Sequence, residues 1–375
     1  MKVLLYSHVF HPSTGGVETV SRTLAEGLAQ RSIDFKLLTS TPAGDDHTDF
    51  GYEVIRMPDP KTVRRLVNWA DVVLFNGASL ALQPALLFSR KPFIWVHVGY
   101  QVSCIDGLGW VDGTAAPMTP WASVVFHSRR SGPVHAAVGG VKLLLRRIVA
   151  RHFASRHVAI THWMDKAQPL PRQVQIYNPF PIDRFRTAAP TSEAPYDFVY
   201  LGRMVSEKGV DTLIQAFARV VQQAHVKPRL LLIGDGDRMA QMQQLAGSLG
   251  VESNVHFAGR QSGQALVEWV GQGGVGIVPS AWHEPMGGVA VELMAAGRGL
   301  IVSEQGGLAE CAGDAGLCFP NGDARALADC MLRVLAEPQL RHTLGQRALQ
   351  RARLFAPDRF IDQYVELLGA TARVA

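Results

Sequence analysis

Long apolar runs, cysteine and low-complexity segments are scarce or missing in this sequence of 375 residues. No stretch approaches the roughly 20 consecutive apolar residues that a membrane-spanning helix requires, so we expect no such helix. Four cysteines without metal-type spacing predict reduced thiols and a cytoplasmic location. The apolar start Met1–Tyr6 is too short for a signal peptide and soon meets His8 and Pro12, so it predicts a first buried strand.

Acidic residues are under-represented in the first half of the chain. Residues 1–180 contain 19 Lys and Arg against 12 Asp and Glu, whereas residues 181–375 contain 18 against 20. This excess of positive charge predicts an anionic partner, either a phosphate-bearing substrate or a peripheral contact with an acidic membrane face. No basic stretch interleaved with aromatic residues and no zinc module occurs, so nucleic acid is not an expected partner.

Both halves alternate short apolar runs with segments of helical period, which is typical of parallel sheets flanked by helices. The strands expected in the first half are Val3–Ser7, Phe35–Thr39, Val72–Phe75, Phe93–Val98, Val124–His127 and Val158–Thr161. Those expected in the second half are Phe198–Leu201, Arg229–Ile233, Val255–Ala258, Gly276–Val278 and Gly299–Val302. The expected helices are Gly16–Ala29, Gly209–Ala224, Met239–Leu249, Gln264–Trp269, Gly288–Ala296 and Ala324–Leu335. The pattern predicts an α/β protein of two Rossmann-like, doubly wound parallel-sheet domains that face each other across a cleft.

Six prolines between Gln168 and Pro195 mark a connection between the two halves. We therefore predict an N-terminal domain over residues 1–178 and a C-terminal domain over residues 179–356. Residues 357–375 are predicted to hold a last helix, with Pro357 in its first turn. Its apolar face is expected to cover another surface, for which the first domain is the candidate.

Two carboxylates flank a glycine pair in the segment Pro279–Glu292. Glu284 lies before Gly287 and Gly288, and Glu292 lies in the helix expected after them. The start of a helix offers unpaired N–H groups to an anion, most often a phosphate. Carboxylates accept hydrogen bonds from hydroxyl groups, so their presence predicts a ligand that carries sugar as well as phosphate. The alternative is an ordinary helix start that carries acids because they favour the positive end of the helix dipole.

Two cations follow another expected strand, in the loop that begins at Gly202. Arg203 can bind phosphate oxygens with two parallel hydrogen bonds, and Lys208 adds a mobile positive charge. Together they are predicted to stabilise a diphosphate as it gains negative charge on leaving. The alternative is a solvated loop in which Lys208 pairs with Glu207 or with another exposed acid.

Three further glycine turns and one histidine follow expected strands. The turns contain Gly15 and Gly16, then Gly234, then Gly259 with Arg260. The first lets the backbone approach a phosphate or sugar, and the other two offer backbone contact to a nucleotide. A simple loop explains the first and the third equally well. The first lacks the Gly-x-Gly-x-x-Gly dinucleotide pattern. Asp235 and Asp237 fit turn chemistry better than a metal site. His97 ends an apolar strand, where it either contacts a substrate hydroxyl or phosphate or is a satisfied buried polar group.

The segment Val141–Val158 mixes basic and apolar residues at helical spacing. One interpretation is a basic amphipathic helix that lies on an anionic membrane. The other, slightly favoured, is a helix that faces the core and exposes its charged side.

In their order along the chain these motifs resemble glycosyltransferase family 4, whose members are retaining enzymes of the GT-B architecture. The motifs are the Gly15-Gly16 loop, His97, Tyr177-Asn178-Pro179, Gly202-Arg203, Lys208-Gly209, Gly234-Asp235-Gly236, Pro279-Ser280, Glu284 to Glu292, and Gly306-Gly307-Leu308-Ala309-Glu310. The match is dense from about residue 196 to 312 and sparse before 160. Each motif is modestly specific, and the ordered set is strongly so.

The resemblance implies transfer of a sugar, with retention of anomeric configuration, from a nucleotide-diphosphate sugar to a glycan, lipid-linked or small-molecule acceptor. UDP is favoured over GDP, no metal or other cofactor is implied, and the leaving phosphate accepts the proton of the acceptor. The N-terminal domain would bind the acceptor and the C-terminal domain the donor. The resemblance gives catalytic roles to His97, Arg203, Lys208 and Glu284, and donor-binding roles to Gly15, Gly16, Gly202, Gly234, Gly259, Arg260, Met286, Gly287, Gly288, Val289 and Glu292.

Within these roles, Arg203 and Lys208 would hold the diphosphate and Glu292 the ribose hydroxyls. Glu284 and the backbone of residues 286–289 would hold the donor sugar, which His97 would face. The two acids are then hydroxyl-binding groups and not the acid–base pair of a glycoside hydrolase.

The sequence departs from the family pattern in two places. Gly299 stands two positions after Gly297, where the family has a proline, and Met286 stands where an aromatic or small residue is common. Residues 99–121 match no family motif and are expected to shape the acceptor site. An epimerase or a phosphorylase of the same architecture would need its own catalytic acids or a pyridoxal-binding lysine, neither of which is evident. A non-catalytic nucleotide-sugar-binding or assembly protein is the alternative from another class.

Overall fold

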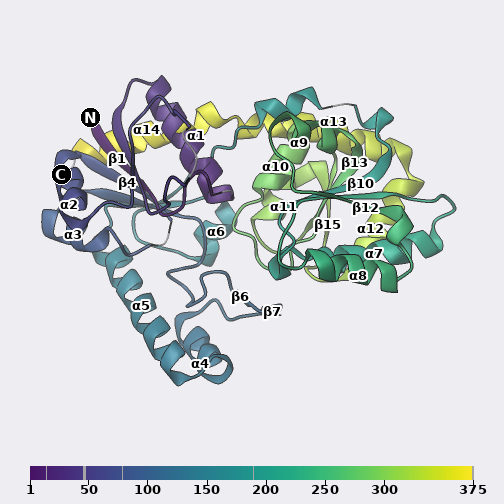
Figure 1. Ribbon diagram of the computed structural model, residues 1–375, viewed down its shortest axis with the longest axis horizontal. Coiled ribbons are helices and arrows are strands. Elements are labelled where there is room, and N and C mark those ends of the chain that lie inside the picture. Colours follow the sequence, from purple (N-terminus) through teal and green to yellow (C-terminus); the bar gives the residue numbers. More distant parts are fainter. Residues whose placement is uncertain (14, 45–47, 78, 189, 374–375) are drawn as a thin grey trace. The chain divides into compact units, whose positions relative to one another are not determined.

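The computed structural model describes residues 1–13, 15–44, 48–77, 79–188 and 190–373, and the chain divides into two compact units (Figure 1). Unit 1 comprises Met1–Pro181 and Ala356–Ala375, and unit 2 comprises Ile182–Phe355. Unit 2 is one continuous segment, whereas unit 1 is completed by the last part of the chain.

Unit 1 contains a seven-stranded sheet in the order β3-β2-β1-β4-β5-β8-β9, and every pair of neighbours is parallel. Its strands are β1 (Lys2–Ser7), β2 (Asp34–Thr39), β3 (Val54–Arg56), β4 (Val72–Asn76), β5 (Phe93–His97), β8 (Arg156–Ala159) and β9 (Gln173–Gln175). A short antiparallel pair is formed by β6 (Trp110–Val111) and β7 (Thr114–Ala115). The helices are α1 (Gly16–Gln30), α2 (Pro60–Trp69), α3 (Gln83–Ser89), α4 (Pro120–Arg130), α5 (Pro133–His152), α6 (His162–Ala167) and α14 (Pro357–Arg373).

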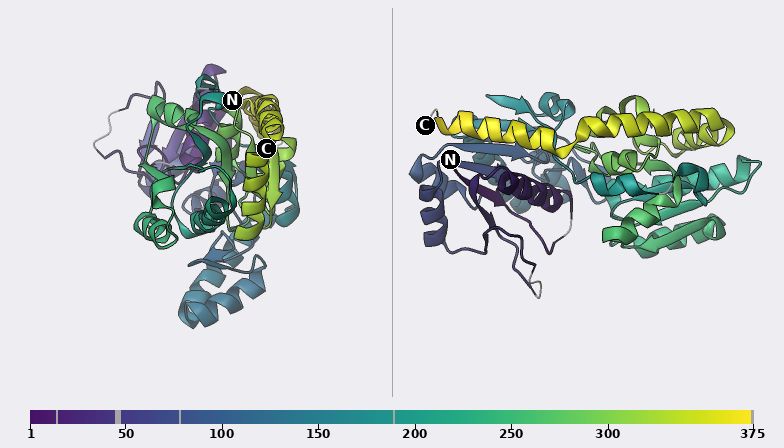
Figure 2. Two further views of the ribbon diagram at one scale, coloured as in Figure 1. Left: turned by 90° about the vertical axis from the view of Figure 1, so that its right-hand side faces the viewer. Right: turned by 90° about the horizontal axis from the view of Figure 1, so that it is seen from above.

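Helix α14 packs on α1 within unit 1, as Figure 2 also shows. Gly27 of α1 lies directly under Ile361, so closely that a Cβ atom at position 27 would come within 2.4 Å of that side chain. Arg31 donates to Asp362 at 2.6 Å and lies 3.3 Å from Asp358, which fixes the start of α14 at the end of α1.

Unit 2 contains a six-stranded parallel sheet in the order β12-β11-β10-β13-β14-β15. Its strands are β10 (Tyr196–Leu201), β11 (Leu230–Ile233), β12 (Val255–Gly259), β13 (Gly273–Val278), β14 (Leu300–Ser303) and β15 (Gly316–Phe319). The helices are α7 (Val210–Gln223), α8 (Met239–Ser248), α9 (Gly263–Gly271), α10 (Gly288–Ala295), α11 (Gly307–Ala312), α12 (Ala324–Ala336) and α13 (Pro338–Ala352). Strand order reverses between β10 and β13, just as it does between β1 and β4 in unit 1. Both units are therefore doubly wound.

Apolar side chains with helical spacing build the core of unit 2. Helix α7 buries Leu213, Phe217 and Val220 completely, and Phe198 of β10 meets Phe217 edge to face. The burial of such apolar side chains is the dominant favourable contribution to the free energy of folding.

One predicted strand is wrong: Val124–His127 lies inside α4. The adjacent valines Val124 and Val125 are typical of a strand. Pro120 at the first helical position, and the basic residues in the last turn, were the stronger signals and indicate a helix. The other predicted strands are present within a few residues of their predicted bounds.

Helices α4 and α5 pack against each other as a hairpin that projects from the sheet of unit 1 (Figure 1). In the part of the chain that the structure describes, no helix is both long enough and apolar enough to cross a membrane.

Candidate active site

The candidate residues of unit 2 follow neighbouring strands at the point where strand order reverses. Strand β10 ends at Leu201 and leads into the loop with Arg203 and Lys208. Strand β13 ends at Val278 and leads into the loop with Glu284. In open α/β sheets this reversal opens a crevice beyond the carboxyl ends of the strands, which is where ligands bind.

Lys208 and Glu284 form an ion pair between these two loops. Lys208 Nζ donates to Glu284 Oε1 at 2.7 Å, and Ser280 Oγ donates to Glu284 Oε2 at 2.5 Å. The side chains of Lys208 and Glu284 are only 18% and 10% exposed. Each carboxylate oxygen thus already accepts one hydrogen bond and keeps one lone pair for a further donor. This arrangement suits a group that binds hydroxyls and disfavours a nucleophile.

Backbone contacts hold the two loops together and explain why Gly209 is needed. Gly209 has φ of 64°, and a Cβ atom there would lie 2.0 Å from the carbonyl oxygen of Pro279. The N–H of Ala281 donates to the carbonyl of Glu207 at 2.9 Å, and the N–H of Gly307 donates to the carbonyl of Glu284 at 2.7 Å. The position of Glu284 is therefore fixed by backbone from three loops.

Arg203 lies on the surface beside this pair. Its side chain is 65% exposed and its Nη2 lies 3.4 Å from Glu207 Oε1, a distance typical of a weak surface ion pair. Its carbonyl accepts a hydrogen bond from the hydroxyl of Tyr200 at 2.7 Å, so the backbone is fixed while the guanidinium can turn. Arg203 and Lys208 thus both lie in the loop after β10, as the sequence spacing requires.

Glu292 points from α10 toward Arg184, which no sequence motif indicated. The two side chains are 3.4 Å apart, and the Glu292 side chain is only 13% exposed. Burial raises the pKa of Glu292 to about 7, and the nearby Arg184 opposes this rise. Arg184 comes from the proline-rich connection, in the short helical turn Asp183–Thr187, and stacks on Phe185.

Glycine backbones form the rest of the strand-end surface of unit 2. A Cβ atom at Gly234 would lie 1.9 Å from the carbonyl oxygen of Gly202, so these two turns touch. Gly234 also donates to the carbonyl of Gly259 at 2.8 Å. Arg260, next to Gly259, is exposed.

The start of α10 is closely packed on one side. Gly287 precedes the helix, and a Cβ atom there would come within 2.5 Å of the Leu308 side chain. Met286 is buried, and no side chain caps the first turn with Gly288 and Val289. The N–H groups of this first turn of α10 therefore have no side-chain partner and can bind an anion.

Arg298, which precedes the Gly299 that stands where the resembled family has a proline, has a structural position. It is 1% exposed and donates to the backbone carbonyls of Gly273 at 2.9 Å and Gly271 at 2.6 Å. It therefore joins the end of α9 to the start of β13 and does not face the candidate site residues.

His97 belongs to unit 1, where it ends β5 and stacks on Trp95. Its Nε2 lies 2.9 Å from Nδ1 of His157, whose Nε2 lies 2.7 Å from the carbonyl oxygen of Ala150. The carbonyl only accepts, so His157 Nε2 carries a proton and its Nδ1 accepts from His97 Nε2. Burial lowers the pKa of His97 well below its usual value and that of His157 to about 4, so both rings are neutral near pH 7. His97 thus keeps Nδ1 as a hydrogen-bond acceptor.

The first glycine loop contains an acid that the sequence analysis did not weigh. Gly15 precedes α1 and Gly16 begins it. A Cβ atom at Gly15 would lie 2.6 Å from Glu18 Oε2, and Ser13 Oγ donates to Glu18 Oε1 at 2.8 Å. A phosphate at this helix start would therefore meet the negative charge of Glu18.

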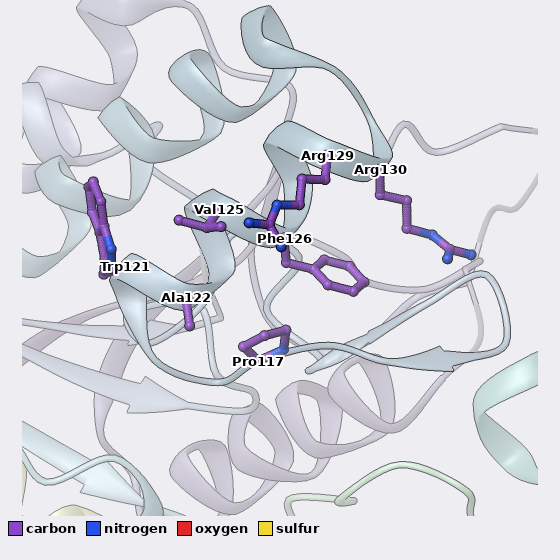
Figure 3. Close-up of a pocket in the computed structure, with 7 residues that line it drawn as sticks. All are labelled: Pro117, Trp121, Ala122, Val125, Phe126, Arg129 and Arg130. Carbon is purple, nitrogen blue, oxygen red and sulfur yellow. The ribbon is translucent and has the colours of Figure 1, made fainter.

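Asp106 organises the segment 99–119, which contains the β6–β7 pair and leads into α4. Its Oδ1 accepts from the N–H groups of Leu108 at 2.8 Å and Trp110 at 3.2 Å, and its Oδ2 lies 3.3 Å from Nε2 of His127 on α4. This loop ends at a pocket of about 650 Å³ beside α4 (Figure 3). The pocket is lined by Pro117, Trp121, Ala122, Val125, Phe126, Arg129 and Arg130. Its walls are apolar except for the two arginines, both from the last turn of α4.

Within the described ranges, no three His, Cys, Asp or Glu side chains gather so that they would hold a metal ion. Asp235 Oδ1 accepts the N–H of Gly236 at 2.7 Å, which is the turn chemistry that the sequence indicated.

Residues 181–351 match a family model described as glycosyl transferases group 1. The match thus covers almost all of unit 2. The chain is 30% identical over 176 residues to N-acetyl-alpha-D-glucosaminyl L-malate synthase of Bacillus anthracis, covering 46% of this chain and 45% of that protein. It is 31% identical over 196 residues to a lipopolysaccharide core biosynthesis glycosyltransferase of Rhizobium meliloti, covering 50% of this chain and 54% of that protein. The matches thus span about half the length of these curated relatives.

The similarity to solved structures extends over both units. Anabaena HepE in complex with UDP-glucose superposes with a TM-score of 0.71, covering 99% of this chain and 100% of that chain, at 19% sequence identity. This similarity confirms the predicted fold, which is GT-B with two doubly wound parallel-sheet units.

Proposed function

We propose that this protein is a retaining glycosyltransferase that moves a sugar from a nucleotide-diphosphate sugar to an acceptor without a metal ion. The observation that carries this proposal is the Lys208–Glu284 pair, which joins the loops after β10 and β13 at 2.7 Å. It brings a phosphate-binding cation and a hydroxyl-binding carboxylate together where strand order reverses. The family match over residues 181–351 supports the same activity.

Unit 2 holds the donor. Lys208 and the mobile guanidinium of Arg203 bind the diphosphate, and Glu292 accepts hydrogen bonds from the ribose hydroxyls. Glu284 accepts hydrogen bonds from the sugar through its remaining lone pairs, together with the backbone from Met286 to Val289. Gly202, Gly234, Gly259 and Arg260 line the nucleotide. UDP is the favoured nucleotide, which is supported by the solved relative with UDP-glucose.

Transfer proceeds on one face of the sugar. The bond between the anomeric carbon and the diphosphate oxygen breaks, and the two cations stabilise the negative charge that develops on the leaving diphosphate. The same phosphate takes the proton of the acceptor hydroxyl as the new glycosidic bond forms. Neutral His97 accepts a hydrogen bond at Nδ1 from a hydroxyl of the transferred sugar. Gly15 and Gly16 are the weaker part of the proposed donor site, because Glu18 would repel a phosphate that approaches them. No protein carboxylate acts as a nucleophile.

Unit 1 holds the acceptor, which is a glycan, a lipid-linked glycan or a small molecule. The pocket beside α4 supports a lipid-linked acceptor, because its apolar walls suit a hydrocarbon chain while Arg129 and Arg130 suit a phosphate (Figure 3). The protein then works in the cytoplasm, peripherally at the inner face of the cell membrane, through the basic first half of the chain.

A panel of nucleotide sugars tests the proposal, first by thermal shift and then by transfer or donor hydrolysis with and without chelator. We expect one uridine nucleotide sugar and UDP to raise the melting temperature, and transfer to persist in chelator. If no nucleotide sugar or nucleoside diphosphate shifts the melting temperature, the donor site is wrong. Loss of activity in chelator contradicts the metal-independent mechanism. Binding without transfer or donor hydrolysis favours the alternative, a non-catalytic nucleotide-sugar-binding or assembly protein.

A further inference from the structure

We propose that the α4–α5 hairpin of unit 1 docks on an anionic lipid bilayer. An apolar stripe on α5 enters the boundary between headgroups and acyl chains, and the cations beside the stripe bind lipid phosphates. This contact goes beyond sugar transfer, and it is measured without any donor or acceptor.

The stripe consists of branched apolar residues at intervals of four, three, four and three along α5. They are Val134, Val138, Val141, Leu145 and Ile148, with exposed fractions of 76%, 51%, 58%, 48% and 40%. This spacing places all five on one face of a helix. The buried positions Ala136 and Leu143 lie on the opposite face. Helix α5 therefore turns a continuous apolar face to solvent over about 20 Å of its length.

The sequence analysis slightly favoured the reverse arrangement, with the apolar side of this segment in the core. A stable soluble surface rarely carries five large apolar side chains in a row, so the stripe requires a partner.

The charges around the stripe identify that partner. No Asp or Glu occurs between Asp112 and Asp165, whereas seven Lys and Arg occur there. At 100° per residue, exposed Lys142 lies on one side of the stripe and exposed Arg151 on the other. An apolar face bordered by cations is the pattern of a helix that lies in a membrane interface, where long basic side chains reach the phosphates.

Other occupants fit this surface less well. A second copy of the hairpin would bring cations against cations, because the segment contains no acid to oppose them. A nucleic acid would require cations at the centre of the contact, where the stripe is apolar. An anionic bilayer accommodates both features at once. Trp121, 78% exposed at the start of α4, adds an aromatic side chain of the kind that favours membrane interfaces.

Vesicle flotation of the full chain tests the proposal. The vesicles are either pure phosphatidylcholine or phosphatidylcholine with about one-third phosphatidylglycerol, in the absence of nucleotide sugar. The stripe variant is Val141→Asp with Leu145→Asp. Its matched control is Val226→Asp with Leu354→Asp, two apolar residues of unit 2 that are 61% and 53% exposed. The charge variant is Lys142→Gln with Arg151→Gln, matched by Arg219→Gln with Lys227→Gln, both exposed residues of unit 2.

We expect wild type and both controls to float with anionic vesicles and not with neutral ones. The charge variant should bind about 25-fold more weakly, since each basic residue near an anionic surface contributes roughly fivefold. The stripe variant should bind at least about thirtyfold more weakly. Because the substituted side chains are exposed, melting temperatures should not change. If the aspartates lower the melting temperature, Val141→Ser with Leu145→Ser replaces them.

Three results would overturn the proposal. In the first, the wild-type protein does not bind anionic vesicles. In the second, the stripe variant binds as tightly as its control. In the third, the charge variant loses binding while the stripe variant keeps it. The last result, with equal competition by RNA, indicates a general polyanion surface. Because vesicle binding is measured without donor, failure here removes the proposed peripheral membrane location but leaves the proposed sugar transfer standing, and failure of transfer leaves the membrane contact standing.

Discussion

Lys208 and Glu284 are 76 positions apart in the sequence, and their side chains meet at 2.7 Å. The pair is nearly buried, so each charge depends on the other for stabilisation in a medium of low dielectric constant. In the proposed donor site, Lys208 both binds phosphate and holds the loop, so a single substitution cannot separate the two roles. A double substitution separates them.

Lys208→Met should lower both stability and transfer. The free energy of unfolding falls by about 2–4 kcal/mol because Glu284 is left as a buried charge without its cation. Transfer falls at least about 100-fold because a positive charge is lost from the leaving diphosphate. Urea denaturation and transfer assays on the same preparation measure the two effects.

Lys208→Met combined with Glu284→Gln is the control for this substitution. The amide needs no cation, so stability should return close to that of wild type while transfer stays lost. A double variant that regains stability and also transfers at the wild-type rate would show that Lys208 has only a structural role.

Arg203→Ala should separate binding from stability without a second substitution. Its exposed ion pair with Glu207 contributes less than about 1 kcal/mol, so unfolding should hardly change. Affinity for UDP should fall roughly tenfold to a hundredfold, with Arg203→Lys in between because it cannot form the two parallel hydrogen bonds. Isothermal titration calorimetry with UDP measures the three affinities. Equal affinity in wild type, Arg203→Lys and Arg203→Ala would show that Arg203 does not bind the diphosphate.

Glu292→Gln should make the protein more stable and a weaker binder. Burial raises the pKa of Glu292 from 4.5 to about 7, so the folded state holds a proton that the unfolded chain has lost. The free energy of unfolding of wild type therefore falls as pH rises from about 4.5 to about 7, then levels off. Removing the charge gains about 2 kcal/mol above pH 7. UDP affinity should rise with pH over the same window in wild type, because the ionised carboxylate accepts from both ribose hydroxyls.

The matched control for this experiment is Glu268→Gln, an exposed acid on α9 of the same unit. It should leave both pH profiles unchanged. If Glu292→Gln binds UDP as wild type does at every pH, Glu292 does not contact the ribose.

Gly234→Ala should unfold unit 2 in part or completely. Gly234 has φ of 140°, and the new methyl group would lie 1.9 Å from the carbonyl oxygen of Gly202. A loss of more than about 3 kcal/mol is expected because backbone would have to move. Gly247→Ala in α8 is the control, since nothing lies within 4 Å of its Cβ position. It should stabilise by roughly 0.5–1 kcal/mol. Equal melting temperatures for the two variants would contradict the close approach.

The His97–His157 pair should make unit 1 sensitive to acid. Burial lowers the pKa of His157 from 6.5 to about 4, so the unfolded chain binds a proton that the folded state refuses. The free energy of unfolding therefore falls as pH falls from about 6.5 toward 4. His157→Asn should flatten this slope by about one proton; its amide oxygen can take the place of Nδ1 in accepting from His97, whereas the bond to Ala150 is lost with the ring. The exposed His342→Asn is the control, and an unchanged slope for His157→Asn would contradict the assignment.

The sequence predicted the fold well wherever a strand is an apolar run that ends at glycine, as at Leu201 and Ile233. It missed Gln173–Gln175, because an edge strand of three residues with one apolar side chain has no readable period. It also misassigned Val124–His127, where β-branched residues outweighed the proline at the helix start. Local patterns give element type reliably only when propensity and end signals agree.

The sequence predicted which loops hold the candidate residues, but not which side chains pair with them. Spacing alone indicated Arg203, Lys208, Glu284 and Glu292, because each lies next to a glycine turn after a strand. Their partners carry no local signal: Arg184 is 108 positions from Glu292, and His157 is 60 positions from His97. Such contacts depend on how distant segments pack. The exposed face of α5 was missed for the same reason. Hydrophobic periodicity shows that a helix is amphipathic, but not which of its faces is buried.

Helix α14 has a consequence for how the protein is made. A ribosome delivers residues 182–355 as one uninterrupted stretch, so unit 2 can fold while synthesis continues. Unit 1 appears first but has to wait, because the face of α1 around Gly27 stays uncovered until Ile361 and its neighbours leave the exit tunnel. The first-made half of the molecule is thus the last to be finished, and a nascent chain that stalls before α14 would expose that face to chaperones and proteases.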